Sequence, residues 1–590
     1  MTDPTFFPAW LRLTHLINII LMTFLLRSGL QIFSAFPRLY LSDNTRPGDE
    51  WLKLNRNQVP EEDPDEVYQE IMKREEEGKA GDDTGTPPPR HSPLRILAWS
   101  AAALFVSLPL LLNWGSGDSS ARHRGVIGSI AFGAQLLAGA LVPTRRSAAT
   151  PVHPPNRIYT SLDEEADISP WLALPGHKQL GLGRHWHFAS DVFWIANGLA
   201  FVILVFVTGY WRFLVPQSWS IFPEAGRAIW TYLHLALPPE LPGQPFNAIQ
   251  KLSYFAIIFI VAPTQILTGL AMSPSLTAQY PWYLKLFGGR QKARSLHFVS
   301  FVLFVLFIIV HVTMVFLHGF AHEAGLIIWG RAERPAATVG IAVAVLCFII
   351  LICALANWAS LRHPRKVQRA LGVLLHRILT DAFGWEASRQ EYPRGAASSY
   401  FWVNGQPPVG QDYKDLARRN FTPWRLTVKG LVEQPLSLSL DDLRKLPKET
   451  QVTKHNCIQG WSDIAEWGGV SMSTILNLCR PKPEAGYVVF HAMDNKSETE
   501  PERIGEGYFY GTLNIQLARH PQTILAYEMN GEPLPVPHGA PLRLRCETEL
   551  GFKMVKWLDS IELVANYQNI GAGQGGWRED FQHYDTEAGI

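Results

Sequence analysis

Seven long apolar runs occupy the first 360 residues of the chain. They cover residues 11–33, 94–114, 125–142, 188–214, 249–272, 295–317 and 337–358. Each has about 18 or more residues, the length that a helix needs to cross the hydrocarbon core of a bilayer. The pattern predicts an all-α transmembrane bundle of about seven helices. The Gly- and Ala-rich run 125–142 also fits a re-entrant or interfacial segment.

The pattern of apolar positions changes after the last run. Residues 365–383 place Val367, Leu371, Leu374 and Ile378 on one helical face, which predicts an amphipathic helix at a membrane surface. From about residue 400, short β-type runs at 424–428, 487–490, 542–544 and 560–564 alternate with Gly and Pro signals. These runs predict a soluble α+β domain.

Three regions follow from this pattern. Residues 1–360 form the membrane domain, 361–399 an amphipathic linker and 400–590 the soluble domain. Between the first two runs, the acidic and Pro-rich segment 34–93 predicts a solvated loop with a short helix around residues 67–77. The first run starts too late for a removable signal peptide, and no small-residue cleavage site follows it, so we interpret it as a membrane helix.

Composition excludes several classes of protein. The 590 residues carry a net charge of +1 and are 47% hydrophobic, an average of two unlike halves. The five cysteines form no CxxC pair and no evenly spaced framework, so neither a zinc site nor a disulfide scaffold is indicated. The soluble domain has no basic stripe, which argues against nucleic-acid binding.

The sixth apolar run carries His297 and His311, fourteen residues apart. A helix separates them by about 21 Å along its axis and about 40° around it, so they share a face near opposite leaflets. Neutral imidazole is a natural axial ligand of haem iron, and polar groups inside a membrane are costly. Counting spans puts His15 on the side of His311, and His187 on the side of His297. We therefore predict two b haems, one between each pair.

Three other histidines compete for these roles. His185 is two residues from His187, but its place beside Arg184 and Trp186 is typical of an interfacial residue. We interpret His318 and His322 as interfacial as well.

At these positions the sequence resembles the di-haem cytochrome b family typified by the γ subunit of formate dehydrogenase and by thiosulfate reductase cytochrome b. The resemblance covers four of the seven runs and rests on the motifs RLTHLIN, GRHWHF, FNAIQKLSYF, TGLAMSP, RSLHF and IIVHVTM. It implies that haems carry electrons between a quinone and a second redox centre. The second, third and seventh runs have no counterpart in the four-helix core of that family.

Cys457 stands in KHNCIQGWS, after a strand-like run and before a Gly-Trp turn. A thiolate there can bind a soft metal, whereas buried free cysteines more often serve as inert packing. The motifs around it closely resemble the sulfite oxidase family of molybdopterin enzymes, from about residue 400 to the chain end. These motifs are PWRLTVKGLVEQPLSLSLDDL, HNCIQGW, AYEMNGEPLPVPHGAPLRLR and GFKMVKWLDSIE.

The second resemblance implies roles for individual residues. Cys457 is the single protein thiolate on molybdenum, and Asn404 contacts the pterin. His538, Arg543 and Lys556 hold the pterin phosphate, a role suited to charged donors.

A substrate-pocket tyrosine is also implied by this resemblance. Tyr510 stands at the position of this tyrosine, and Tyr508 is the alternative.

The residues after Cys457 depart from the family pattern. Animal and plant sulfite oxidases have arginines there that help to bind sulfite, but here the sequence continues Ile-Gln-Gly-Trp. An anionic substrate would need another cation, such as Arg425 or Lys454. A neutral oxide such as a sulfoxide is at least as plausible a substrate as sulfite.

The sequence therefore predicts a membrane-bound molybdenum oxidoreductase. It exchanges electrons between a quinone pool and a small oxyanion, S-oxide or N-oxide through two b haems. The cofactors are molybdopterin and two haem b, and the partners are quinone, a small-molecule substrate and the lipid membrane. A homo-oligomer is compatible with the sequence. The alternative is a transmembrane electron conduit whose C-terminal domain docks or senses without turnover.

Basic residues near the spans predict on which side of the membrane the soluble domain lies. Lys and Arg are several times more numerous on the side that holds the segment after residue 358, which predicts a cytoplasmic domain at a bacterial inner membrane. No adjacent arginine pair stands directly before Ala337 as an export signal. A periplasmic domain is the alternative, because many bacterial relatives of this domain work outside the membrane.

Overall fold

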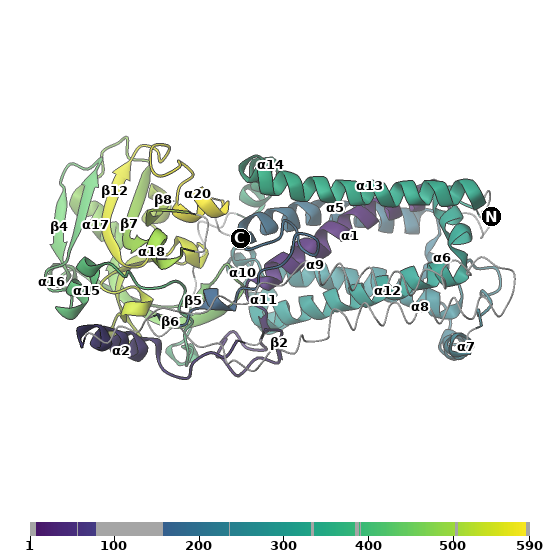
Figure 1. Ribbon diagram of the computed structural model, residues 1–590, viewed down its shortest axis with the longest axis horizontal. Helices are drawn as coiled ribbons and strands as arrows, with labels where there is room; N and C mark the ends of the chain where they lie inside the picture. The colour runs from purple at the N-terminus through teal and green to yellow at the C-terminus, as the bar shows by residue number, and fades with distance from the viewer. Residues whose placement is uncertain are drawn as a thin grey trace.

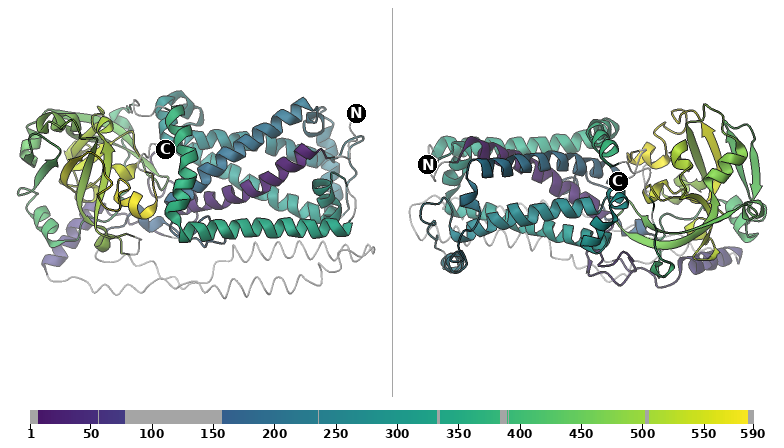
Figure 2. Two further views of the ribbon diagram at one scale, coloured as in Figure 1. Left: turned by 90° about the horizontal axis from the view of Figure 1, so that it is seen from above. Right: turned by 180° about the vertical axis from the view of Figure 1, so that it is seen from behind.

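The computed structural model has two bodies arranged end to end, one helical and one rich in strands (Figure 1). It describes residues 7–55, 57–77, 157–234, 236–331, 335–383, 389, 391–501 and 505–585. The predicted runs 94–114 and 125–142 lie outside the described residues. Both views in Figure 2 show the same two-part shape, with the start of α1 at the end of the helical body that is remote from the strands.

Five helical spans in the described part of the chain are long and apolar enough to cross a membrane. They are α1 (Ala9–Ser34), α5 (Leu180–Val207), the continuous α8 (Ala248–Ala256), η2 (Ile257–Val261) and α9 (Ala262–Ala271), α12 (Arg290–Ile328) and α13 (Pro335–Arg362). Between 6% and 22% of each apolar stretch is buried inside the protein, which leaves most of the surface for lipid. The helical bundle predicted from the apolar runs is confirmed for these five spans.

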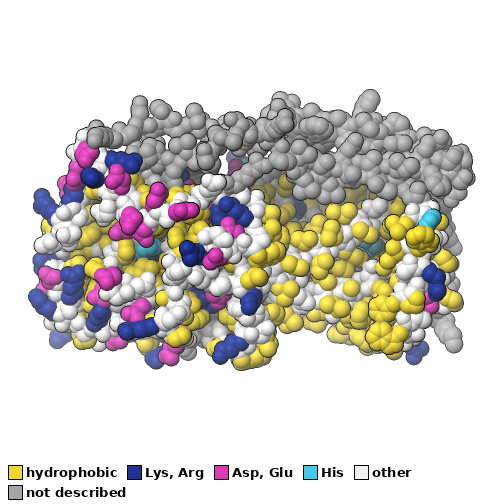
Figure 3. All heavy atoms as spheres, turned by 90° about the horizontal axis from the view of Figure 1, so that it is seen from below, with side chains coloured by type: hydrophobic (Ala, Val, Ile, Leu, Met, Phe, Trp, Pro, Cys, Tyr) yellow, Lys and Arg dark blue, Asp and Glu magenta, His cyan; other side chains and the backbone are white. Residues whose placement is uncertain are grey.

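Charged and apolar side chains occupy different parts of the molecular surface. Figure 3 shows a broad hydrophobic surface over the helical body and mixed charges over the strand-rich body. The protein is therefore a multi-pass membrane protein with a domain outside the bilayer. Short helices lie at the two ends of the bundle: α6 (Trp211–Leu214) and α7 (Ile221–Leu233) at the remote end, and α10 (Pro274–Gln279) and α11 (Pro281–Phe287) at the other.

The segment after α1 leaves the bundle and joins the strand-rich body. It forms the strand pair β1 (Arg38–Leu39) and β2 (Leu52–Lys53), followed by helix α2 (Pro64–Glu76). Tyr68 and Met72 of α2 are buried in the core of the strand-rich body. The helix predicted around residues 67–77 is confirmed, and its apolar face is packed against the soluble domain.

Two five-stranded sheets form the soluble domain, with the core between and around them. The first has the order β10-β9-β6-β5, with β11 also paired to β9, and the second has the order β4-β3-β12-β7-β8. The strands are β3 (Arg425–Gly430), β4 (Leu436–Ser439), β5 (Lys448–Asn456), β6 (Ser462–Ser471), β7 (Tyr487–Asn495), β8 (Tyr508–Asn514), β9 (Thr523–Met529), β10 (Glu532–Pro533), β11 (Arg543–Cys546) and β12 (Leu558–Val564). All four predicted β-type runs lie in or beside these strands, and the domain is a mixed α/β fold.

Short helices complete the domain. They are η1 (Ser161–Glu164), η4 (Arg394–Ala396), α15 (Gln411–Arg418), α16 (Leu440–Arg444), α17 (Met472–Cys479), α18 (Lys496–Thr499), α19 (Ile515–Ala518), η5 (Val536–His538), η6 (Gly551–Lys553) and α20 (Trp577–Gln582).

The predicted amphipathic helix is α14 (Pro364–Phe383), at the junction of the two bodies (Figure 1). Arg365 donates to the carbonyl oxygens of Glu579 and Asp580, at 2.5 and 2.8 Å, and Gln368 donates to Tyr584 O at 3.0 Å. The described part of α14 thus also contacts the C-terminal segment of the soluble domain.

An apolar cluster joins the two bodies. It combines the end of α1, the start of α5 and loops of the soluble domain, and its buried members are Ala35, Phe36, Tyr40, Leu180, Trp402, Cys457, Ile458, Trp461, Leu550, Phe552 and Tyr584. Burial of large side chains from both bodies in one cluster fixes the domains against each other. The candidate metal ligand Cys457 therefore lies at the domain junction.

Candidate redox sites

Cys457 opens the turn that joins the long antiparallel strands β5 and β6. Its amide donates to Trp461 O at 3.1 Å, and the Gly460 amide donates to Cys457 O at 3.1 Å, which closes a tight loop over residues 457–461. Gly460 has φ +110°, a conformation that other L-residues rarely adopt. We call this segment the thiol loop.

The thiol of Cys457 is 1% exposed and has one polar neighbour from another loop. Asn404 Nδ2 lies 3.3 Å from its Sγ and donates to it. Burial raises the pKa of this thiol to about 11, although Asn404 and the charges of Arg578 and Arg290 act in the opposite direction. A bound metal ion would deprotonate such a thiol, because only the thiolate coordinates.

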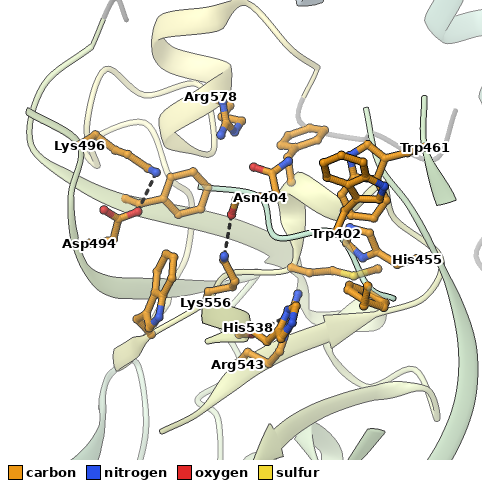
Figure 4. A pocket seen from close by; sticks show the side chains of 16 residues that line it. Trp402, Asn404, His455, Trp461, Asp494, Lys496, His538, Arg543, Lys556 and Arg578 are labelled. Carbon is orange, nitrogen blue, oxygen red and sulfur yellow. Dashed lines mark hydrogen bonds and ion pairs between the residues drawn. The ribbon is translucent and has the colours of Figure 1, made fainter. Parts of the chain in front are cut away.

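A cavity of about 590 Å³, counting the space open at its mouth, lies beside the thiol loop. Its lining combines aromatic rings with cations from several loops (Figure 4): Phe401, Trp402, Asn404, His455, Trp461, Asp494, Lys496, Phe509, His538, Arg543, Gly551, Phe552, Met554, Lys556, Trp557 and Arg578. Four residues predicted from the sequence, Asn404, His538, Arg543 and Lys556, thus meet at one cavity. Cys457 does not line the cavity itself, but it contacts Asn404, which does.

Lys556 and Arg543 form a buried cationic wall, with the His538 ring beside them. Lys556 Nζ donates to the carbonyl oxygens of Asn404 and Pro537, at 2.6 and 2.9 Å, and Arg543 donates to His538 O at 2.8 Å. Burial lowers the pKa of His538 to about 3, and burial lowers the pKa of Arg543 and of Lys556 well below their usual values.

This wall has the chemistry of an anion site. Arg543 Nε is buried without a hydrogen-bond partner among the described residues. The hydrogen bonds of Lys556 and Arg543 go to carbonyl oxygens, and buried positive charges of this kind are stabilised by an anion bound between them. The donor set therefore fits the phosphate of a pterin cofactor.

Sequence reasoning missed four polar residues of the lining, which are His455, Asp494, Lys496 and Arg578. His455 stacks on Trp461, with ring centroids 5.2 Å apart, and its place two residues before Cys457 was the available signal. Lys496 is paired with Asp494 at 2.7 Å, and Arg578 comes from α20. None of Asp494, Lys496 and Arg578 stands in a local sequence pattern that could have shown its position.

Other predicted residues are not brought to the cavity. The hydroxyl of Tyr510 donates to Asp580 at 2.5 Å and lies 3.1 Å from Ile570 O, and the ring is not part of the lining. Tyr508 is 64% exposed and also lies outside the lining. Arg425 donates to Ser437 on the neighbouring strand.

Lys454, the other cation considered for an anionic substrate, is held elsewhere. Its ammonium group pairs with Asp43 at 3.2 Å, and it does not line the cavity.

The four predicted membrane histidines meet in two pairs. The ring centroids of His15 and His311 are 6.3 Å apart, and those of His187 and His297 are 6.4 Å apart. A metal-imidazole bond of about 2 Å, with about 1.1 Å from nitrogen to ring centre on each side, places two opposed imidazoles about 6 Å apart. Both pairs therefore have the spacing that one iron ion between two rings requires.

Hydrogen bonds favour the ligating tautomer in the second pair. Nδ1 of His297 lies 3.1 Å from the carbonyl oxygen of Gln265, which favours the proton on this nitrogen and the lone pair on Nε2. Ser28 donates to Phe24 O at 2.7 Å and can therefore accept from Nδ1 of His187, 3.0 Å away. The Gln265 amide lies 2.8 Å from Nε2 of His297 and would turn away from a bound iron.

The competing histidines have protein partners. His185 Nε2 lies 2.9 Å from Asp585, and its Nδ1 lies 2.9 Å from Gly181 O. His318 Nε2 lies 2.9 Å from the hydroxyl of Tyr232 near the remote end of the bundle.

Comparison with known families accounts for both halves of the chain. Residues 7–328 match the model of prokaryotic cytochrome b561, and residues 414–570 match that of the oxidoreductase molybdopterin-binding domain. Both resemblances drawn from the motifs are thereby confirmed.

Individual relatives are similar over part of their length. A putative protein-methionine-sulfoxide reductase subunit YedZ1 of Azospira oryzae is 35% identical over 157 residues, 27% of this chain and 53% of that protein. The protein-methionine-sulfoxide reductase catalytic subunit MsrP of Xanthomonas campestris is 37% identical over 147 residues, 24% of this chain and 45% of that protein. MsrP of Campylobacter jejuni is 32% identical over 150 residues, 25% and 50% of the two chains. This chain spans about half the length of these curated relatives.

Among solved structures, the sulfane dehydrogenase SoxCD of Paracoccus pantotrophus aligns with 21% identity and a TM-score of 0.22. The alignment covers 31% of this chain and 46% of that one.

Proposed function

Because the chain belongs to the prokaryotic cytochrome b561 family and carries a molybdopterin oxidoreductase domain of the sulfite oxidase type, we propose that it reduces a sulfoxide with electrons from a membrane quinol. The quinol loses two electrons and two protons to become a quinone. The sulfoxide takes up two electrons and two protons, its S–O bond breaks, and the products are a sulfide and water.

The observation that carries this proposal is the arrangement of three sites along one molecule. The His15 and His311 pair lies near the remote end of the bundle, the His187 and His297 pair lies at the other end, and Cys457 follows at the domain junction. When bound, the molybdenum cofactor supplies two-electron oxygen transfer, and haem supplies one-electron steps. The spacing of both imidazole pairs supports a haem count of two.

The residues of the cavity take the following roles. Cys457 holds the metal, and the Asn404 amide keeps the thiolate sulfur oriented through its 3.3 Å hydrogen bond. Arg543, Lys556 and His538 bind the pterin phosphate through the cationic wall. We assign no role to Tyr510, because its hydroxyl is bonded away from the cavity.

A neutral oxide suits the thiol loop better than sulfite does. In place of arginines, the loop has Gln459, which donates to Ala35 O and Ser161 O, at 3.1 and 2.9 Å. The loop side chains are therefore used to hold the loop, and they supply no charge for a small anion. The methionine-sulfoxide reductases among the relatives support the same substrate class.

Haem absorbance provides the test of substrate class. Purified full-length protein is reduced with a short-chain quinol under anaerobic conditions and mixed with methionine sulfoxide. We expect the haems to be reoxidised and one sulfide to form for every two electrons. Oxidised protein mixed with sulfite is expected to stay oxidised. Haem reduction by sulfite, or no reoxidation by sulfoxide, would contradict the proposal.

We also propose that the molybdenum domain faces the cytoplasm. Among the described residues, the end of the bundle next to this domain is the richer in basic residues, as the positive-inside rule requires of a cytoplasmic side. This end carries Arg27, Lys178, Arg184, Lys285, Arg290, Lys292, Arg294 and Arg362, against Arg12, Arg212, Arg227, Lys251 and Arg331 at the remote end.

Protease accessibility tests this orientation. In sealed spheroplasts, external protease is expected to leave the region after residue 400 intact, and lysis is expected to make it susceptible. Digestion from outside before lysis would place the domain in the periplasm.

A further inference from the structure

The first two turns of α12 contact the thiol loop directly. Arg290 Nη1 lies 3.2 Å from Gly460 O and 3.4 Å from Trp461 O, and Gln291 donates to Gly460 O at 2.9 Å. The guanidinium of Arg294 lies so close to Gly460 that a Cβ added there would be 3.0 Å from its Nε. A membrane helix thus forms part of the support of the candidate metal ligand.

The same face of α12 carries a predicted haem ligand. Arg290, Arg294 and His297 stand at positions i, i+4 and i+7 of one helix. This spacing keeps the three within about 60° around the axis and within about 10.5 Å along it. The two arginines therefore lie between the thiol loop and the His187 and His297 pair.

Among the described residues, the hydrogen bonds of the two arginines go to carbonyl oxygens. Arg294 donates to Phe36 O and Arg38 O, both at 2.6 Å, and Arg290 has only carbonyl partners. No ion pair of either is found in the part of the chain that the structure describes. Asp43 lies nearby, but it accepts from the Gln291 amide and pairs with Lys454.

Two buried guanidinium groups that form no ion pair among the described residues, beside the candidate haem site, favour binding of an anion. Haem b brings two carboxylates at its edge, and Arg is the side chain best suited to bind carboxylate. Positive charge near a haem also favours its reduced form, because reduction removes one positive charge from the iron.

We propose that Arg290 and Arg294 serve both redox centres: they hold the thiol loop on the cytochrome, and their charges raise the reduction potential of the haem between His187 and His297. The proposal rests on the proposed function, since it requires a haem at that pair. Arg290 and Arg294 act as positioning and tuning residues, and neither touches the substrate.

Redox titration of the full-length protein separates the two haems. With haem absorbance as the signal, we expect two one-electron components, of which His297→Ala removes one and thereby identifies it. In the Arg290→Gln, Arg294→Gln double variant, that component is expected to shift to lower potential while the other stays in place. The Arg290→Lys, Arg294→Lys variant keeps both charges and is expected to restore the potential.

A matched control lies at the opposite end of the bundle. Arg12 stands three residues before His15 and donates to Ile328 O at 2.8 Å, so Arg12→Gln is expected to leave the His297-dependent component unchanged. If the glutamine double variant does not accumulate, Arg290→Gln alone gives the same comparison.

The outcomes are distinct. A shift of neither component, or an equal shift of both, overturns the role of the arginines, and so does a lysine variant that behaves like the glutamine variant. A wild-type protein without two haem components contradicts the proposed function itself.

Discussion

Replacement of Cys457 by serine is expected to abolish sulfoxide reduction while the haem spectrum stays that of the wild type. Serine is isosteric, but its hydroxyl does not ionise readily and is a poor ligand for a soft metal. We expect turnover to fall by about a thousandfold or more, as for loss of a group on which the whole reaction depends. The proposed haem ligands lie on α1, α5 and α12, so the haems should remain reducible by quinol.

The measurement combines turnover, molybdenum content and haem absorbance on one preparation. Cys479→Ser is the matched control, because Cys479 is also fully buried and lies in the core of the soluble domain, away from the cavity. This control should keep most of its activity. Wild-type turnover in Cys457→Ser would disprove a role for this thiol in catalysis.

Loss of one haem, and of electron flow to the molybdenum site, is expected from His297→Ala. The iron between His187 and His297 would lose one of two axial ligands, and a haem held by a single histidine in this position should dissociate. His311→Ala should remove the other haem and leave the His187 and His297 site filled. In both variants, quinol-driven turnover is expected to fall by about a hundredfold or more, because a gap opens in the chain of redox centres.

Haem per chain, from extracted haem and protein concentration, checks this expectation. His185→Ala is the control: its ring is bonded to Gly181 and Asp585, so both haems should remain. Two haems per chain in His297→Ala and in His311→Ala would show that the ligand assignment is wrong.

The sequence was sufficient to predict features that depend on local residue patterns or on the number of membrane spans. Lengths of apolar runs predicted the spans, and the alternation of spans predicted which histidines meet, because a chain that crosses a bilayer must change sides each time. The pairs His15 with His311 and His187 with His297 follow from this rule, and their 6.3 and 6.4 Å separations agree with it. The strand-like run before Cys457 likewise predicted β5.

The sequence was insufficient where function depends on contacts between distant segments. The Ile-Gln-Gly-Trp sequence after Cys457 indicated only that the arginines of sulfite oxidases are missing. Its positive role appears when Gln459 is seen bonded to Ala35 and Ser161, and Gly460 to α12. Tyr510 had the right motif, but its hydroxyl is bonded to Asp580, a residue 70 positions later.

The docking of α2 has a consequence for how the protein is made. Tyr68 and Met72, translated before most of the membrane domain, complete the core of the domain that is translated last. That core cannot close until the ribosome has finished almost the whole chain. We therefore expect the molybdenum cofactor to be loaded late in biogenesis, after the first helices have inserted and α2 has docked.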